Sequence, residues 1–359
     1  IVRKLLEDAE AAVSDGVFSV MDKIEVPPSG EKRDYLHPAP YYWPNPNTAT
    51  GLPYVYRDGE RHPDTILNSS ESAKYDRTRL QKMFNNTFIL ALAHFFTGDP
   101  RFATHAVDLL RTWFLDPRTG MNPNLRYAQF IPGRKKREGK HTGIIEAKDL
   151  YFLLDGVKLL EESKDWTRDD TSRLQRWCAE YLDWLQTSHN GRLESWVPNN
   201  HGTYYDLQMV ALARFIEDER SVQRTLRRAK RRLGLQFSRS GKQRFEVRRS
   251  ITLHYCCFNL QGWSHLATVA TRAGEDLWEH KSLGGSLEQA FKWLLSYFDR
   301  DWPYRQIEHF DQDRFYPLLA QAKRRYPDMA ASITMEDIYG LKPRFDPHDG
   351  IRPYWQLGL

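Results

Sequence analysis

The clearest candidates for chemistry in this sequence are three consecutive polar residues, Asn199, Asn200 and His201. They follow Pro198, and an apolar pattern with helical spacing begins soon after them, over residues 203 to 217. The amino terminus of a helix attracts anions, and an imidazole there can titrate near neutral pH. The segment therefore predicts either a site for an anionic ligand or, more simply, a helix cap at Asn200 beside a half-buried histidine.

A second pair of candidate residues, Arg249 and Tyr255, lies further along the chain. Tyr255 begins a helical pattern that covers residues 255 to 273. A guanidinium group can offset a carboxylate charge, and a phenol can give or take a proton. Taken alone, the pair also fits a surface arginine and a tyrosine at the edge of the core. His254 is a weaker candidate, since successive helix residues point about 100° apart and cannot both face one ligand.

The elements that must position these residues are helices. From residue 76 onward, apolar side chains recur with helical spacing, connections are mostly short, and strand signals are scarce. After a short helix at 2–14, helices are expected at 76–97, 101–115, 144–163, 167–187, 203–217, 219–235, 255–273, 284–298 and 313–325. The pattern predicts an all-α fold, an (α/α) toroid or barrel of paired helices. A plain helical solenoid is the alternative, although no fixed-period repeat is found.

A long segment before these helices, residues 23 to 70, matches neither a helix nor a series of strands. It is rich in proline, and its aromatic residues, which include Tyr42 and Trp43, argue against disorder. A loop of this length is usually functional, so we expect an ordered, aromatic-rich lid or wall. The expected organisation is one domain over residues 1–359, with a lid at 23–70, a helical toroid at 76–325 and a C-terminal extension at 326–359.

Composition narrows the class of protein. The net charge of +5 suits an anionic partner, without separating nucleic acid from acidic polysaccharide. No run of apolar residues is long enough to span a membrane. The three cysteines, Cys178, Cys256 and Cys257, are expected to be buried free thiols, and no metal-ligand spacing stands out, so we expect neither metal nor cofactor. Ile1 is not a start methionine and no signal peptide is visible, so a mature or trimmed chain is expected.

Four blocks of the sequence together resemble the alginate-lyase-like domain of polysaccharide lyase families five and thirty-eight. They are Asp-Tyr at 34–35 with Ala-Pro-Tyr-Tyr-Trp-Pro at 39–44, Gly-Leu-Pro-Tyr at 51–54 and Arg-Asp-Gly-Glu at 57–60; Met-Asn-Pro-Asn-Leu at 121–125 with Tyr-Ala-Gln at 127–129 and Gly-Ile-Ile at 143–145; Asn-Asn-His-Gly-Thr at 199–203; and Arg249 with Tyr255 and Phe-Asn-Leu at 258–260. The combination is far more specific than any one block. The long Pro- and Tyr-rich segment favours family thirty-eight, although Tyr42 stands where the family often has tryptophan.

The resemblance implies a helical toroid that cleaves a polyuronate by elimination. It implies that the catalytic residues are Asn200, His201, Arg249 and Tyr255. Arg248 is the alternative to Arg249, because the alignment in that turn could shift by one residue. The candidate substrate-binding residues are Tyr42, Trp43, Asn124, Tyr127 and Gln129. For Tyr42 and Trp43, stacking on sugar rings and packing of the long loop are equally plausible. A basic insert at 134–142 departs from the family pattern and puts its local subsite in doubt.

The chemistry of such a cleavage sets three requirements. The uronate carboxylate must be offset, a base must take the C5 proton, and an acid must protonate the leaving O4. Asn200 and Arg249 suit the first requirement, and His201 and Tyr255 suit the other two. In β-D-mannuronate and β-D-glucuronate the C5 proton and O4 lie on one face, so one tyrosine could serve in turn as base and acid. In α-L-guluronate they lie on opposite faces and need a separate base.

We therefore expect a secreted or periplasmic lyase that acts on polymannuronate or glucuronan by syn β-elimination, leaving a 4,5-unsaturated end. Its expected partner is an anionic polysaccharide, with no nucleic acid and no membrane span. A glycoside hydrolase on the same toroid is one alternative, but Asp206 and Glu246 do not form a convincing carboxylate pair. A noncatalytic polyanion-binding module is another, supported by Arg224, Arg227, Arg228, Lys230, Arg231, Arg232, Arg239, Lys242 and Arg244. That run is more typical of a solvated helix face.

Overall fold

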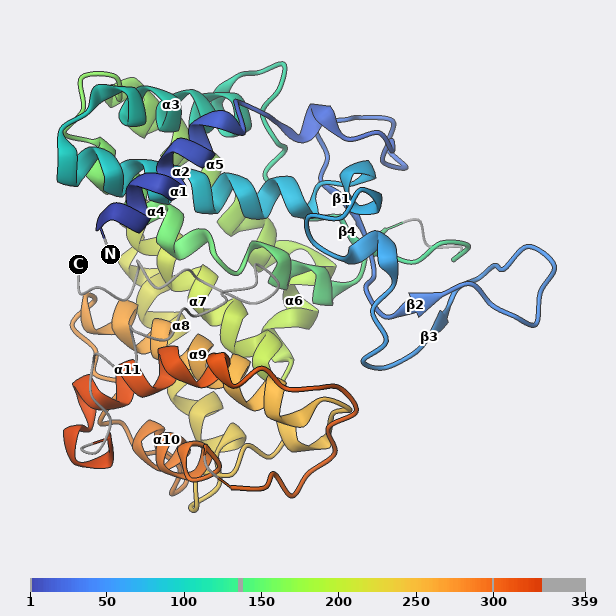
Figure 1. Cartoon of the computed structure of the whole chain (residues 1–359), viewed down its shortest axis with the longest axis vertical. Helices are drawn as coiled ribbons and strands as arrows, with labels where there is room; N and C mark the ends of the chain where they lie inside the picture. The colour runs from blue at the N-terminus through green and yellow to red at the C-terminus, as the bar shows by residue number, and fades with distance from the viewer. Residues whose placement is uncertain (1, 135–137, 299, 331–359) are drawn as a thin grey trace. The chain divides into compact units, whose positions relative to one another are not determined.

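The computed structural model describes residues 2–134, 138–298 and 300–330, and most of this part of the chain is helical (Figure 1). The predicted all-α class is therefore confirmed. The expected C-terminal extension lies outside the described residues from position 331 onward, as do residues 135–137 of the basic insert. Contacts between Cα atoms divide the chain into two compact units, residues 1–193 and residues 194–359, and each is described by itself. Every helix among the described residues is too short or too polar to cross a bilayer.

Helices make up most of the first unit. They are α1 (Val2–Ser14), α2 (Arg77–Thr97), α3 (Pro100–Leu110), α4 (Leu150–Leu160) and α5 (Arg168–Thr187). α2 packs against both α3 and α4 and is buried along most of its length. It ends at Gly98, whose φ of +71° is the left-handed conformation that glycine adopts most easily. Asp99 then caps α3, which begins at Pro100, one residue before the predicted start at 101.

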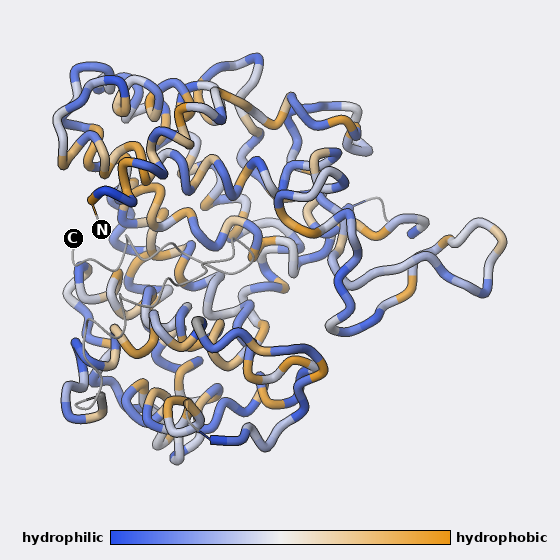
Figure 2. Tube along the Cα trace, viewed as in Figure 1, coloured by the Kyte–Doolittle hydropathy of each residue, from blue (hydrophilic) through white to orange (hydrophobic). Residues whose placement is uncertain are grey.

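Two short two-stranded sheets occur in the first unit. β1 (Leu36–Pro38) pairs in parallel with β4 (Tyr127–Phe130), which brings two of the sequence blocks into direct contact. β2 (Tyr42–Trp43) pairs antiparallel with β3 (Val55–Tyr56) in a hairpin that extends away from the helices of this unit (Figure 1). In Figure 2 the hydrophobic colour lies mainly along the helices, whereas the loop of this hairpin is mostly hydrophilic or intermediate.

Buried polar contacts fix the long segment at residues 23 to 70 to its own unit. Its role as a lid or wall stays a prediction. Lys23 forms a fully buried ion pair with Asp76, with 2.9 Å between Nζ and Oδ2. Burial raises the pKa of Asp76 to about 6, although Lys23 opposes this shift. Tyr35 and His37 both reach the buried carboxylate of Glu146, each at 2.7 Å. The last two contacts hold the start of β1 against the segment that carries Glu146.

The second unit contains all four predicted catalytic residues, and most of its described part is helical. Its helices are α7 (Asn200–Phe215), α8 (Glu219–Gln236), α9 (Thr252–Thr271), α10 (Leu287–Leu295) and α11 (Tyr316–Arg325). α7 packs against α8 and α9, and nearly every residue of α7 and α9 is buried. α6 (His189–Trp196), which the sequence analysis did not predict, crosses the boundary between the two units along the chain. The three cysteines are buried and free, as expected.

Candidate active site

The first turn of α7 carries Asn200 and His201. Asn199 is the N-cap, in an extended conformation, and its side-chain oxygen accepts the backbone N–H of His201 at 3.0 Å. The predicted cap at Asn200 and the predicted start at residue 203 are therefore wrong. The chain turns directly after Pro198, which leaves Asn199 outside the helix and Asn200 as its first residue. Asn200 is thus free of a capping role and available for another.

Asn200 is held by the carboxylate of Glu246. The Asn200 backbone N–H donates to Oε1 at 2.7 Å, and its side-chain Nδ2 donates to Oε2 at 2.9 Å. Both residues are only 1% exposed. Burial raises the pKa of the Glu246 carboxyl, while the two hydrogen bonds from Asn200, and then the charges of Arg249 and His201, oppose that rise.

His201 is held by a second buried carboxylate. Its Nδ1 atom lies 2.7 Å from Oε1 of Glu194, a side chain with 0% exposure, whereas the His201 side chain is 16% exposed. An ionised carboxylate can only accept, so Nδ1 carries a hydrogen in this contact and Nε2 is the ring atom that can exchange a proton with a ligand. Glu194 therefore selects the tautomer of His201.

Tyr255 and Arg249 contact each other directly. Nη2 of Arg249 donates to the Tyr255 hydroxyl at 2.9 Å, and the guanidinium carbon lies 3.9 Å from the centre of the tyrosine ring. A positive charge in this position stabilises negative charge that develops on the phenol oxygen. Arg248 is exposed, so the structure brings Arg249 and not Arg248 to Tyr255. His254 stacks on Phe258 and meets the Tyr255 ring edge-on.

A network of buried amides links the start of α7 to the helix of Tyr255. Gln236, the last residue of α8, donates to the Asn199 carbonyl at 2.9 Å. Its side-chain oxygen accepts from Asn259 at 2.9 Å and from Trp263 at 2.8 Å, both on α9. Asn259 lies one turn after Tyr255, so the network fixes the tyrosine helix relative to the residue that caps α7.

Arg232 fixes the chain just before α7. Its guanidinium pairs with Asp206 and donates to the backbone carbonyls of Ser195 and Val197. A Cβ at Gly202 would overlap both Arg232 and the Val197 carbonyl, so only glycine fits there. The prediction of a solvated basic face on this helix is wrong for Arg232, and also for Arg228, which turns inward to the same Asp206 carboxylate. Asp206 is engaged by the two arginines, and Glu246 is engaged by Asn200. Neither carboxylate is therefore available to a hydrolase pair.

The candidate substrate-binding residues all lie in the first unit. Tyr127 and Gln129 belong to β4 and are buried, and Gln129 accepts a hydrogen bond from Thr142 at 2.7 Å. The Asn124 side chain accepts the backbone N–H of Arg126. Gln129 has a φ of +53°, which is uncommon for a residue with a side chain and turns the strand at this position.

Tyr42 and Trp43 pack within the hairpin of β2 and β3. Tyr42 is buried, with its ring 5.4 Å from that of Tyr56 and 5.0 Å from the Lys140 ammonium. The centre of the Trp43 ring lies 4.9 Å from that of the His62 ring, and Nε1 of Trp43 donates to the Glu60 carbonyl. These contacts match the packing role that the sequence analysis weighed for both residues.

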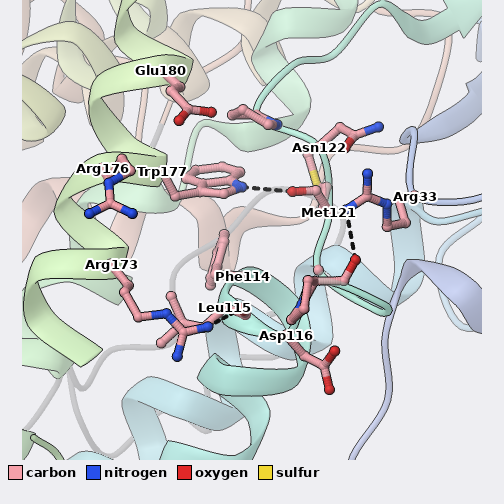
Figure 3. Close-up of a pocket in the computed structure, with 13 residues that line it drawn as sticks. Arg33, Phe114, Leu115, Asp116, Met121, Asn122, Arg173, Arg176, Trp177 and Glu180 are labelled. Carbon is pink, nitrogen blue, oxygen red and sulfur yellow. Dashed lines mark hydrogen bonds between the residues drawn. The ribbon is translucent and has the colours of Figure 1, made fainter. Parts of the chain in front are cut away.

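A pocket of about 420 Å³ lies within the first unit (Figure 3). Trp177 of α5 forms part of its lining and donates to the Met121 carbonyl at 2.7 Å, and Arg33 donates to the Pro117 carbonyl (Figure 3). None of the sequence-predicted site residues lines this pocket. Among the described residues there is also no group of three His, Cys, Asp or Glu side chains that could hold a metal ion.

Sequence reasoning missed Glu194 as a partner of His201 and considered Glu246 only as part of a hydrolase pair. Glu194 lies seven positions before His201, on α6, a helix that was not predicted. Glu246 is 46 positions from Asn200, and no local pattern links them. Sequence offered one usable signal, a glutamate three residues before Arg249 in the block that carries Tyr255.

Comparisons with known proteins agree on one family. A family model described as Alginate lyase matches residues 19–302. A crystal structure of an alginate lyase from Bacteroides ovatus is 34% identical, covers 95% of this chain and 93% of its own, and has a TM-score of 0.87. Alginate lyase A1-III from Sphingomonas species A1 is 16% identical, with 82% and 78% covered and a TM-score of 0.56, and shows a shared fold. No curated protein sequence matches. The expected toroid class is confirmed by the first of these structures.

Proposed function

We propose, from the premise that this chain belongs to the alginate lyase family and is a polysaccharide lyase, that it cleaves β-1,4-linked polymannuronate or glucuronan by syn β-elimination. The product would carry a 4,5-unsaturated uronate at its new non-reducing end. The protein would act outside the cytoplasm, where such polymers are met. The candidate substrate-binding residues of the first unit stay predictions within this proposal.

The contact between Arg249 and Tyr255 is the observation that best supports this reaction. A phenol is a weak base when neutral, and removing the C5 proton requires that negative charge be tolerated on its oxygen. The Arg249 donor at 2.9 Å provides a fixed positive charge at that atom. As the phenolate, Tyr255 would take the C5 proton and then return that proton to O4 as the C4–O4 bond breaks, because both groups lie on one face of a mannuronate or glucuronate ring.

Asn200 and His201 would act on the carboxylate side of the sugar. Both stand in the first turn of α7, where the helix amino terminus favours an anion. His201, with Nδ1 fixed by Glu194, would direct Nε2 toward the substrate and offset the charge that builds up as C5 loses its proton. In this scheme Tyr255 moves the proton, and the other three predicted catalytic residues offset negative charge.

The test is the near-ultraviolet absorbance of the purified protein incubated with polymannuronate, polyguluronate and glucuronan in parallel. Each substrate would be run with and without a chelator. We expect absorbance to rise with polymannuronate or glucuronan, unchanged by chelator, because elimination creates a conjugated double bond. Reducing ends released without absorbance would instead indicate hydrolysis. A rise with polyguluronate alone would contradict the syn mechanism, since that sugar requires a separate base.

A further inference from the structure

The side-chain amide of Asn200 has two chemically different ends, and Glu246 contacts one of them. The Glu246 carboxylate accepts from the Asn200 backbone at Oε1 and from Nδ2 at Oε2, at 2.7 and 2.9 Å. An ionised carboxylate accepts hydrogen bonds but donates none. The nitrogen end of the amide must therefore face Glu246, and the carbonyl end must face away.

The carbonyl end of Asn200 is buried, and Oδ1 has no hydrogen-bond partner among the described residues. Leaving a buried acceptor unpaired is costly, so proteins rarely keep one without a use for it. The unpaired atom belongs to a predicted catalytic residue in the first turn of α7. It therefore suits a hydrogen-bond donor that arrives with a ligand.

We propose that Glu246 is a positioning residue that holds the Asn200 amide in one of its two orientations, with Oδ1 turned to accept an O–H group of the bound uronate. The remaining hydrogen of Nδ2 is then the one amide donor left for the sugar carboxylate. This inference rests on the proposed function. It differs from the role expected from the sequence, in which Asn200 simply offsets the carboxylate.

The substitution Glu246→Gln tests this idea because it keeps the size of the side chain but reverses one end of it. The Asn200 backbone N–H would still need an acceptor, which would be the glutamine oxygen. The glutamine nitrogen would then face the Asn200 side chain. Because that nitrogen only donates, its partner on Asn200 must be the acceptor Oδ1. Asn200 would turn by about 180°, and Nδ2 would replace Oδ1 on the ligand side.

The experiment compares four proteins: wild type, Glu246→Gln, Asn200→Ala and the double variant. We expect Glu246→Gln to lower kcat at least about tenfold with KM changed by less than about threefold and Tm nearly unchanged. In the Asn200→Ala background, the same substitution should lower kcat no further, because Glu246 acts through the amide that is missing. A loss of equal size in both backgrounds would overturn the inference, as would a wild-type kcat for Glu246→Gln.

An activity-independent readout separates this inference from the proposed function. In protein labelled with ¹⁵N only at asparagine, the Asn200 side-chain signal is identified by its absence from Asn200→Ala. We expect that signal to shift in Glu246→Gln, and an unmoved signal would contradict the inference even if the wild type cleaved none of the polymers tested. An inactive wild type with a shifted signal would remove the proposed function alone.

Two further variants guard against a trivial loss of structure. Glu246→Asp keeps the carboxylate, and we expect it to retain more activity than Glu246→Gln; equal loss in both, with both folded, would overturn the inference. Asp170→Asn is the matched control, since Asp170 is another buried carboxylate and pairs with Arg111 in the first unit. It should lose stability while its kcat stays at the wild-type value.

Discussion

Nδ1 of His201 lies 2.7 Å from Oε1 of Glu194, a carboxylate with no exposed surface. This pairing leaves Nε2 as the ring nitrogen of His201 that can meet a ligand. It also links the first turn of α7 to α6, the helix in which Glu194 lies. The proposed task of His201 depends on this neighbour as much as on the histidine itself.

Glu194→Gln should lower kcat at least about tenfold, because a neutral amide can pair with either tautomer of His201 and no longer fixes Nε2 as the atom that faces the ligand. The measurement is the initial rate of ultraviolet absorbance on the preferred polymer. Glu275→Gln is a suitable control, since Glu275 forms a partly exposed ion pair with Lys230. An unchanged rate in Glu194→Gln would show that the tautomer of His201 does not matter to turnover.

Tyr255→Phe should lower turnover by about 10²–10⁴-fold while polymer binding is largely kept, because only the proton-transferring oxygen is removed. The aromatic ring that packs in the second unit remains. Turnover by absorbance and oligosaccharide affinity by calorimetry would be measured on the same preparation. Near-normal turnover would remove Tyr255 from the mechanism.

Arg249→Lys and Arg248→Lys form a matched pair that tests the choice between neighbouring arginines. Lysine cannot both stack on the Tyr255 ring and donate to its hydroxyl as Arg249 does, so kcat/KM should fall at least about tenfold. Arg248 is exposed, and its variant should behave like the wild type. Equal losses in the two variants would contradict the assignment of Arg249.

Gly202→Ala should destabilise the protein by about 1–3 kcal/mol and reduce activity, because the added methyl group displaces Arg232 or the Val197 carbonyl at the start of α7. Urea unfolding and the absorbance rate would measure the two effects. Gly156→Ala on α4 is the control, since its Cβ would lie 3.3 Å from the nearest atom and far less must move. Equal stability of the two variants would argue against tight packing at Gly202.

Asp170 should make stability depend on pH in the acid range. Burial alone would raise its pKa, but hydrogen bonds from Arg111 and Thr167 lower it to about 2. The folded value lies below the unfolded one, so this contribution is complete above about pH 4 and is lost as pH falls toward 2. Asp170→Asn should therefore cost about 2 kcal/mol at pH 7 and progressively less below pH 4. Chemical denaturation at several pH values would measure the difference, and a cost that did not depend on pH would contradict it.

Local patterns were sufficient for most of the helices, whereas the four proposed catalytic residues came from the family resemblance and stay predictions. The Gly98-Asp99-Pro100 boundary, for example, follows from the backbone preferences of those residues alone. α6 was missed because its eight residues, His189–Trp196, include a glycine and show no regular apolar stripe. The short strands were missed too, since β1 pairs with β4 from far along the chain and β2 and β3 are only two residues each.

The residue types and spacing in the sequence determined the helical class, the family blocks and the residues that could carry elimination. Only the tertiary structure decided that Asn199 and not Asn200 is the cap, that Arg249 meets Tyr255, and that Arg232 turns inward. It also showed that Glu194 and Glu246 hold the first turn of α7. The physical reason is that capping and pairing depend on three-dimensional distance. A buried carboxylate is stabilised by whichever donors the fold brings near, however far apart they lie in the chain.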